Sequence, residues 1–528
     1  HAARITGVPA ALIERAAELL AKPHADGTRP KASFMLEKGN YWSNNYMNSA
    51  SFAALGLVCG AGNRKGQMIG RGGGHQRGMI SAAGNPDWLS PEKYPGRRKK
   101  PLNLDRWLMD GQLRFAWVFG TTWIGAMAAS DELERHIDRL TRGSPHQPQQ
   151  ATVAAATAAL IARADSGGMV LVDSDIYPVE PLGTRYADIV LPAATWGEAD
   201  FTRCNGERRL RLYGRFCDAP GQAQPDWWAV QAFARRMGFG DKFAWKNGND
   251  VFEEAARYSR GSPYDYYELV EQVRRGRVTG HEYLRRLGGD GIQTPVWRQG
   301  NTIAGTVRLH DPLTRQGEPG AFRNKLLNAF NTHSGKAVLL KTPWNFPGWS
   351  EFYAAAQPRL EKQELWITNG RINEVWQSGF DDLRKPYTAA RGLPQILFMN
   401  PEDARRRGIE SGDRVRVSND TVYVQTGMPL GVTEHEMNFN ELLAAGHIRA
   451  TQGSFEAVAM LDPGMRPGVA KAGFNARGSH ANAVSHAVPD PMTNNYRYKL
   501  GRGRVERLEA AAEKTDLMGP SLKPRGLA

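Results

Sequence analysis

The chain alternates between strand-like and helix-like hydrophobic patterns over its first two hundred residues. Apolar residues recur at helical spacing from Pro9 to Leu20, with the proline in the first turn, where it is tolerated. The apolar run Arg114–Phe119 indicates a strand, the alanine-rich stretch Ala151–Ala164 a helix, and Met169–Val172 a second strand. Strands that alternate with helices in this way predict an α/β domain built on a doubly wound parallel sheet.

Small and polar residues follow both predicted strands. Gly120–Trp123 come directly after the first strand, and Asp173–Asp175 come directly after the second. In open parallel sheets, ligands bind beyond the carboxyl ends of the strands. We therefore expect Gly120, Thr121 and Asp175 to contribute to a binding site.

The pattern changes to short strands and turns in the last third of the chain. Leu365–Thr368 reads as a strand that leads into a turn at Asn369–Arg371. Asn400 is placed to cap a helix that starts at Pro401, and Arg414–Ser418 alternates like a half-buried strand. These signals predict a separate, mostly β domain from about residue 360 to 505. Residues 250–344 show no pattern that we can assign.

The length and the charge narrow the picture. A chain of 528 residues allows roughly three domains at about 150 residues each. Its 41% hydrophobic and 23% charged residues exclude a disordered protein. A net charge of +14 favours an anionic ligand. We expect no nucleic-acid partner, because basic runs such as Arg97–Lys100 are usually solvated and no recognisable nucleic-acid module accompanies them.

The cysteines and the chain ends carry further expectations. Cys59, Cys204 and Cys217 form no CxxC pair, so we expect no structural zinc, although a bridge between Cys204 and Cys217 stays open. The longest apolar run, Phe52–Gly62, is shorter than the ~20 residues of a spanning helix, so we expect no transmembrane segment. Because the chain starts at His1 and not at Met, we expect an N-terminal part of a longer polypeptide to be missing.

Three polar constellations could carry chemistry. In the first, Arg71 and His75 flank three glycines, which suits either an anion-binding loop or a plain surface loop. The second is a polar run after an apolar strand, which suits either a binding edge of an α/β sheet or a solvated loop. The third surrounds Arg371, which would hold a phosphate well, although its TxGR pattern is weak as a motif. The members of the second and third are Glu198, Thr202, Asn205, Glu207 and Arg208, then Asn369, Gly370, Arg371, Trp376, Gln377 and Ser378.

Taken together, five ordered segments resemble the dimethyl sulfoxide reductase family of molybdopterin oxidoreductases. They are the glycine-rich Gly62–Gly70, the Ala187–Pro192 strand with Glu198 to Arg208, the Thr368–Arg371 turn, Asn400–Asp413, and Asn482 with Tyr498–Lys499. The resemblance implies molybdopterin-binding α/β domains and a C-terminal double-psi β-barrel. It also implies a molybdenum bis(molybdopterin guanine dinucleotide) cofactor.

Within the family, the chain looks most like the large subunit of arsenite oxidase. This likeness rests on Gly39–Asn48, Arg71–Gly78, Asp226–Trp228 and Gly291–Thr294. By that resemblance Arg71 and His75 line the arsenite pocket and no residue of this chain binds metal. Arsenite is neutral and arsenate is an anion, so a guanidinium and an imidazole would stabilise charge that develops during oxidation.

The resemblance also implies cofactor contacts, partners and a location. The contacts are expected from Gly120, Thr121, Asp175, Glu198, Asn205, Asn369, Gly370, Arg371, Gln377, Ser378, Asn482 and Lys499. The expected partners are a Rieske iron-sulfur small subunit and a cytochrome or copper protein as electron acceptor, with an iron-sulfur cluster in the missing N-terminal part alone. The expected location is the periplasm.

The expected domain borders follow from the same family pattern. They are the end of an α/β domain at 1–30, an α/β molybdopterin oxidoreductase domain at 31–260, a connecting region at 261–359, the barrel at 360–508 and a tail at 509–528. Two alternatives to an arsenite oxidase remain. One is a molybdopterin oxidoreductase that acts on another oxyanion or on formate, and the other is a non-catalytic basic binding protein.

Overall fold

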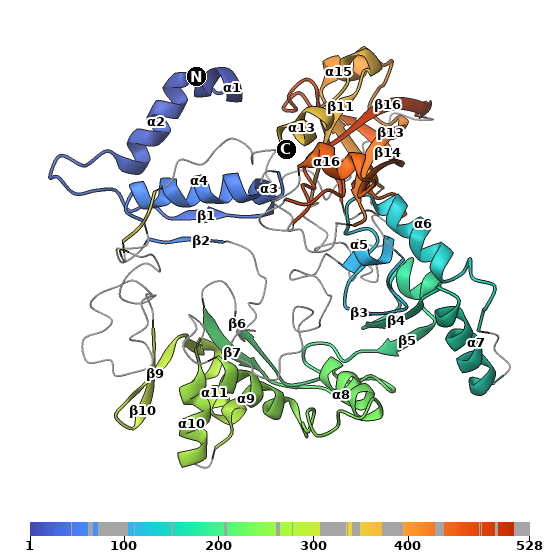
Figure 1. Cartoon of the computed structure of the whole chain (residues 1–528). Helices are drawn as coiled ribbons and strands as arrows, with labels where there is room; N and C mark the ends of the chain where they lie inside the picture. Colours follow the sequence, from blue (N-terminus) through green and yellow to red (C-terminus); the bar gives the residue numbers. More distant parts are fainter. Residues whose placement is uncertain are drawn as a thin grey trace. The chain divides into compact units, whose positions relative to one another are not determined.

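The computed structural model (Figure 1) describes most of the chain as two compact units. The described residues are 1–43, 45–61, 67–71, 104–109, 111–148, 152–204, 208–259, 265–276, 278–306, 334, 336–339, 349–371, 394–427, 438–474, 476, 478–490 and 495–511. The first unit comprises residues 1–40, 47–89 and 194–343, and the second comprises 41–46, 90–193 and 344–528.

A three-stranded parallel sheet begins the second unit. It consists of β3 (Phe115–Phe119), β4 (Val170–Asp175) and β5 (Ile189–Pro192), in the order β3-β4-β5. The short helix α5 (Leu104–Met109) precedes β3 in the chain. Helices α6 (Ser130–Leu140) and α7 (Val153–Asp165) lie between β3 and β4 in the chain. The parallel β-α-β arrangement expected from the hydrophobic pattern is confirmed.

Six strands form a closed barrel in the same unit. They are β11 (Leu365–Gly370), β12 (Ile396–Met399), β13 (Arg414–Gln425), β14 (Ile448–Leu461), β15 (Val469–Gly473) and β16 (Gly501–Glu509). Their order is β11-β15-β12-β14-β13-β16, and β16 pairs back onto β11. Alternate residues of β13 and β14 point into an apolar core that includes Val415, Val417 and Ala457. The predicted C-terminal β-barrel is confirmed.

Short helices complete the barrel domain. Asn400 caps α15 (Pro401–Arg405) by accepting a hydrogen bond from the Glu402 N–H at 2.8 Å, as its sequence position predicts. The remaining helical elements are α13 (Ser350–Ala355), α16 (Phe439–Ala444) and 3₁₀ turns at Leu360–Lys362 and Ala481–Val484.

One buried carboxylate joins the sheet domain to the barrel. Glu132 of α6 accepts hydrogen bonds from Arg135, from Thr451 of β14 and from Arg449, and it shares a 3.0 Å hydrogen bond with His136. Arg135 also donates to the Gln452 carbonyl oxygen at 3.1 Å. These contacts fix α6 against β14.

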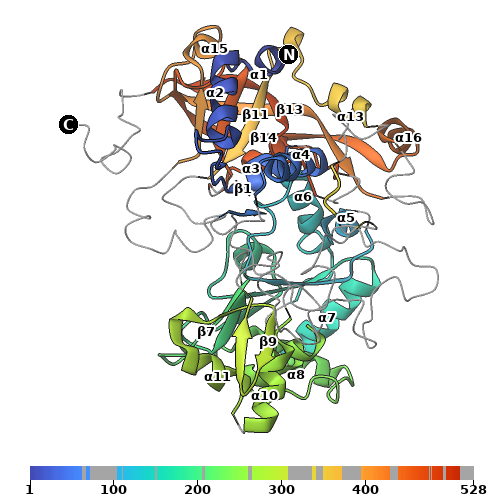
Figure 2. The same ribbon diagram turned by 90° about the vertical axis from the view of Figure 1, so that its left-hand side faces the viewer.

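The first unit is built from two small sheets, a hairpin and several helices. Its N-terminal part contains α1 (Ala2–Thr6), α2 (Ala10–Ala21), β1 (Phe34–Leu36), α3 (Lys38–Tyr41), α4 (Asn45–Val58) and β2 (Ile69–Arg71). The remainder contains β6 (Phe201–Cys204), β7 (Arg209–Tyr213), α8 (Asp226–Arg236), α9 (Gly248–Tyr258), α10 (Tyr267–Gly276), α11 (Gly280–Leu287), β8 (Ile292–Gln293), β9 (Val296–Gln299) and β10 (Thr302–Gly305). Figure 2 shows α10 and α11 beside β7 and β9, where Leu210, Leu269 and Leu284 share one apolar core.

The structure corrects or completes several points of the sequence analysis. Asn369 and Gly370 do not form a turn, because they continue β11 in register with Ala472 and Gly473 of β15. The stretch that we could not assign from sequence folds into α9 to α11 and β8 to β10 over its described part. The three cysteines are free, and Cys217 is exposed, so the open alternative of a Cys204–Cys217 bridge is wrong. Among the described helices, none has both the length and the apolar character that crossing a bilayer requires.

Candidate functional site

The predicted site residues are divided between the two units. Arg71 ends β2, and Glu198 precedes β6, both in the first unit. The second unit holds Gly120, Thr121, Asp175, Asn369, Gly370, Arg371, Asn482 and Lys499. His75, Asn205, Gln377 and Ser378 lie outside the described residues, as does the side chain of Arg71.

The segment from Gly120 to Ala129, called here the 120–129 turn, follows β3 at the carboxyl end of the sheet. The Gly120 N–H donates to the Ser174 carbonyl oxygen at 3.0 Å, which holds the turn beside the end of β4. Trp123 (φ 39°) and Ala129 (φ 52°) adopt left-handed backbone conformations that non-glycine residues rarely adopt. Such strain persists where the surrounding structure enforces it, and it is concentrated at binding and active sites.

Buried polar groups lie at the same end of the sheet. The Thr122 hydroxyl is buried and has no hydrogen-bond partner among the described residues. Both carboxylate oxygens of Asp173 are buried without a well-formed hydrogen bond, although the nearby Val179 N–H favours the charged carboxylate. Burial, and then the neighbouring Asp175 carboxylate, raise the pKa of Asp173 to about 7. Buried polar groups are normally satisfied, so the Thr122 hydroxyl and the Asp173 carboxyl are candidates for a ligand contact at this end of the sheet. Asp175 is also buried, and its Oδ1 accepts a 2.7 Å hydrogen bond from the Ile176 N–H.

Three residues predicted as cofactor contacts meet next to this turn. The Asn369 amide donates to Asn482 Oδ1 at 2.6 Å and to the Tyr498 carbonyl oxygen at 2.9 Å. Lys499 Nζ donates to Asn369 Oδ1 at 2.8 Å, and the Asn482 amide donates to the Gly125 carbonyl oxygen at 3.0 Å. This chain of contacts, called here the amide relay, connects the barrel to the 120–129 turn.

The other two predicted residues on β11 occupy different surroundings. Gly370 packs against Lys471, whose Cε lies 2.6 Å from the position that a Cβ would take. Arg371 is exposed at the end of the strand. The structure therefore brings Asn369, Asn482 and Lys499 together.

In the first unit, Glu198 lines a cavity of about 500 Å³ together with Asp200, Arg215 and Trp227. Its Oε2 accepts a 2.9 Å hydrogen bond from the Thr195 N–H. Arg208, from the same motif, has a structural role, because its guanidinium donates to the carbonyl oxygens of Thr294 and Thr306. The motif therefore contributes the cavity-lining carboxylate of Glu198 and the hydrogen bonds by which Arg208 holds Thr294 and Thr306.

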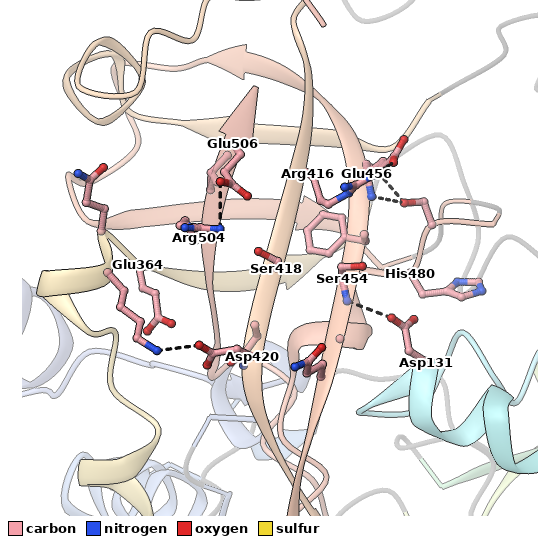
Figure 3. A pocket seen from close by; sticks show the side chains of 18 of the residues that line it. Asp131, Glu364, Arg416, Ser418, Asp420, Ser454, Glu456, His480, Arg504 and Glu506 are labelled. Atoms are coloured by element: carbon pink, nitrogen blue, oxygen red, sulfur yellow. Dashed lines mark hydrogen bonds and ion pairs between the residues drawn. The ribbon is translucent and has the colours of Figure 1, made fainter. Parts of the chain in front are cut away.

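A large groove lies on the outside of the barrel in the described part of the second unit. It has a volume of about 1470 Å³ and runs along β13, β14 and β16 (Figure 3). Its charges neutralise one another: Arg416 pairs with Glu456 at 2.9 Å, and Arg504 pairs with Glu506 at 3.0 Å. Asp131 accepts a 3.0 Å hydrogen bond from the Ser454 N–H at the opposite wall. With its charges paired in this way, the groove is a weaker candidate than the turn.

Two protein-family models match the chain. The family "Molydopterin dinucleotide binding domain" matches residues 365–431, which include β11, β12 and β13. The family "Molybdopterin oxidoreductase" matches residues 179–236, which include β5, β6, β7 and α8.

The chain is also similar to individual proteins. The iodate reductase subunits IdrA of Pseudomonas sp. (strain SCT) and of Denitromonas iodatirespirans are each 59% identical over 531 residues, covering 100% of this chain and 59% of their own length. The arsenite oxidase subunit AioA of Herminiimonas arsenicoxydans is 29% identical over 441 residues, covering 79% of this chain and 48% of its own. Residues 179–236 and 365–431 thus carry domains of the molybdopterin oxidoreductase family.

The chain spans 59% of the length of the two iodate reductase subunits. Among solved structures, acetylene hydratase from Pelobacter acetylenicus matches with a TM-score of 0.42 and 13% identity, over 75% of this chain and 44% of the hydratase. The family expectation from the sequence motifs is confirmed, whereas the arsenite oxidase subunit is much less similar to the chain than the two iodate reductase subunits.

The described residues fit a molybdopterin dinucleotide. Its phosphates, sugars and guanine need many hydrogen-bond partners, and the carboxyl end of the sheet offers the buried Thr122 hydroxyl and Asp173 carboxyl. No group of three or more His, Cys, Asp or Glu side chains in the described ranges is arranged to hold a metal ion. Thr122 and Asp173 lie within the two segments that the sequence predicted for a ligand, Gly120–Trp123 and Asp173–Asp175, although neither was among the individually predicted contacts.

Proposed function

We propose that this chain is part of the molybdopterin subunit of an oxyanion reductase whose substrate is iodate. The observation that carries the proposal is the 59% identity to two iodate reductase subunits over 100% of the chain. Arsenite oxidase, the substrate assignment suggested by the motifs, stands at 29%. The alternative of another oxyanion therefore has more support than arsenite.

The charge of the chain supports an anionic substrate. Iodate is an anion at neutral pH, whereas arsenite is neutral, and a net charge of +14 raises the local concentration of anions. In this proposal Arg71 pairs with the oxyanion, and His75 donates a hydrogen bond to it. Both residues keep the substrate-pocket roles predicted for them, with iodate in place of arsenite.

The second unit is proposed to hold the dinucleotide at the 120–129 turn. Thr122 would donate or accept a hydrogen bond, and Asp175 would accept one from guanine or ribose. A bound molybdenum cofactor would supply two-electron oxygen-atom transfer. The residues of the chain bind and orient the cofactor and exclude water from it.

The proposal changes the role of the redox partner. In a reductase, electrons flow toward molybdenum, so the expected cytochrome or copper protein becomes an electron donor instead of an acceptor. We keep a Rieske iron-sulfur subunit and a periplasmic location as parts of the proposal, and both derive from the family resemblance. Fractionation of the native cells would test the location.

The decisive experiment compares two substrates on the purified enzyme with its companion subunit. Oxidation of reduced methyl viologen is followed with iodate, and reduction of a dye acceptor is followed with arsenite. We expect turnover with iodate and none with arsenite. Turnover with arsenite alone would overturn the substrate assignment, and absence of bound molybdenum together with tight nucleic-acid binding would favour the non-catalytic alternative.

A variant at Arg71 tests the substrate pocket. Arg71→Ala is expected to lower kcat/KM for iodate by at least about a hundredfold while molybdenum content stays unchanged, because an oxyanion loses its charge-assisted hydrogen bonds. Arg414→Ala is the matched control, since Arg414 is half-exposed on β13. Equal activity of both variants would remove Arg71 from the pocket.

A further inference from the structure

The side-chain amides of Asn369 and Asn482 are committed to protein contacts. Asn369 Nδ2 makes two hydrogen bonds, to Asn482 and Tyr498, and its Oδ1 accepts one from Lys499. Asn482 uses Oδ1 toward Asn369 and Nδ2 toward the Gly125 carbonyl oxygen. An amide nitrogen has two protons, so Asn369 Nδ2 has none left for a ligand.

Burial makes these contacts strong determinants of position. Asn369 is 5% exposed and Asn482 is 2% exposed, so neither amide can exchange its partner for bulk water. Leaving a buried polar group unsatisfied is more costly than the net gain from one hydrogen bond. The relay therefore favours one placement of the 120–129 turn against the barrel.

Two further contacts hold the turn in that placement. The Ala129 N–H donates to the Ser485 carbonyl oxygen at 3.0 Å, which fixes the far end of the turn. His480 lies over Gly125, with Nδ1 2.6 Å from the position that a Cβ would take, so the close approach requires glycine. The turn so held carries Thr122, whose buried hydroxyl has no described partner.

From this division of polar groups, we infer that Asn369, Asn482 and Lys499 are positioning residues. They assemble the dinucleotide site by locking the 120–129 turn to the barrel before the cofactor arrives, and Thr122 is left to contact the cofactor. The inference rests on the molybdopterin part of the proposed function and not on iodate as the substrate. It replaces direct cofactor contact as the role of the two asparagines.

The test measures amide hydrogen exchange in the subunit purified from cells that cannot make the cofactor. Asn482→Ala is expected to speed exchange in residues 120–129 by about tenfold, because a buried tether is lost. Asn482→Asp, which keeps the acceptor for Asn369 but loses the donor to Gly125, is expected to have the same effect. Asn400→Ala is the matched control, because Asn400 is a part-buried amide with two hydrogen bonds on α15, away from the turn.

Molybdenum content of the same variants separates positioning from direct contact. In cofactor-producing cells, Asn482→Ala and Thr122→Val are both expected to lose bound molybdenum, but Thr122→Val leaves exchange in the turn unchanged. Loss of molybdenum in Asn482→Ala without faster exchange would overturn the inference and make Asn482 a direct contact. Faster exchange in Asn400→Ala to the same extent would overturn it as well, because loosening would then be general. Neither measurement uses iodate, so the outcome for the positioning residues can be told apart from failure of the iodate proposal.

Discussion

Asp188 and Arg163 form a buried ion pair, with a 2.6 Å hydrogen bond from Arg163 Nη1 to Asp188 Oδ1. Asp188 Oδ2 also accepts from the Leu171 N–H of β4 at 2.9 Å. The aspartate of the ADIVLP segment thus fastens α7 and β5 to β4. Asp188 therefore has a structural role in the sheet.

Asp188→Ala is expected to destabilise the second unit by about 3 to 5 kcal/mol, because it leaves the Arg163 charge buried without its partner. Urea unfolding of the purified subunit measures the loss. Glu506→Ala, which breaks the exposed Arg504–Glu506 pair, is the control and is expected to cost less than about 1 kcal/mol. Equal costs for the two variants would contradict a structural role for Asp188.

Glu132→Gln is expected to weaken the joint between α6 and β14 and to change its response to acid. The His136 hydrogen bond, together with Arg135, Arg449 and Thr451, lowers the pKa of Glu132 below its ordinary value of 4.5. A lowered pKa contributes stability above pH 4.5 that is lost as the pH falls further. Between pH 5 and about pH 3, the Tm of the wild-type protein should therefore fall further than the Tm of Glu132→Gln.

The exposed Glu361 provides the control for this acid response. Glu361→Gln should follow the wild-type Tm curve at every pH, because Glu361 lies at the surface of the groove. If Glu132→Gln also followed that curve, the joint would not contribute to acid sensitivity.

Asp173→Asn is expected to stabilise the protein at pH 8. The pKa of Asp173 is raised from 3.8 to about 7. Between pH 3.8 and pH 7 the carboxyl is therefore protonated in the folded state and ionised in the unfolded state. Stability therefore falls as pH rises from 3.8 to 7, by at most about 4 kcal/mol at about 1.4 kcal/mol per unit. Tm measured at pH 4 and pH 8 should show a gain for the variant at pH 8 alone.

Asp218→Asn is the matched control, since its side chain is 90% exposed. It should leave the difference between pH 4 and pH 8 as in the wild type. An Asp173→Asn variant with the wild-type pH dependence would show that the carboxyl finds a partner in solution.

Gly125→Ala tests the close approach of the turn to the barrel. The new Cβ would lie 2.6 Å from His480 Nδ1. Overpacking of this kind typically lowers stability by about 1 to 3 kcal/mol. Adding His480→Ala to this variant should restore part of the stability, as measured by thermal unfolding. A double variant no more stable than Gly125→Ala would show that His480 is not the obstacle.

The sequence predicted those elements whose signals are local. Asn400 and Pro401 marked the start of α15, and the alternation from Arg414 marked β13, which extends to Gln425. The region around α11 was missed, although Thr279 and Glu282 have the spacing of a helix cap, and the Thr279 hydroxyl accepts from the Glu282 N–H at 3.1 Å. The extension of β11 through Asn369 was missed because Asn and Gly are common in turns.

The relations that define the site could not be predicted in the same way. Asn369 and Asn482 are 113 positions apart, and Asn482 and Gly125 are 357 positions apart, so no local pattern pairs them. Family motifs marked Asn369, Asn482 and Lys499 as important without showing what each contacts. The burial of Thr122 and Asp173 depends on the completed sheet and turn.

Closure of the barrel has a consequence for biosynthesis. Because β16 supplies the strand that joins β11 to β13, residues 501–509 must leave the ribosome before either edge is covered. Asn482 and Lys499 emerge shortly before them, so the nascent chain cannot form the amide relay during most of its synthesis. The amide relay and the closed barrel can therefore form only after residues 501–509 have been synthesised, and until then β11 and β13 each lack the neighbour that β16 supplies.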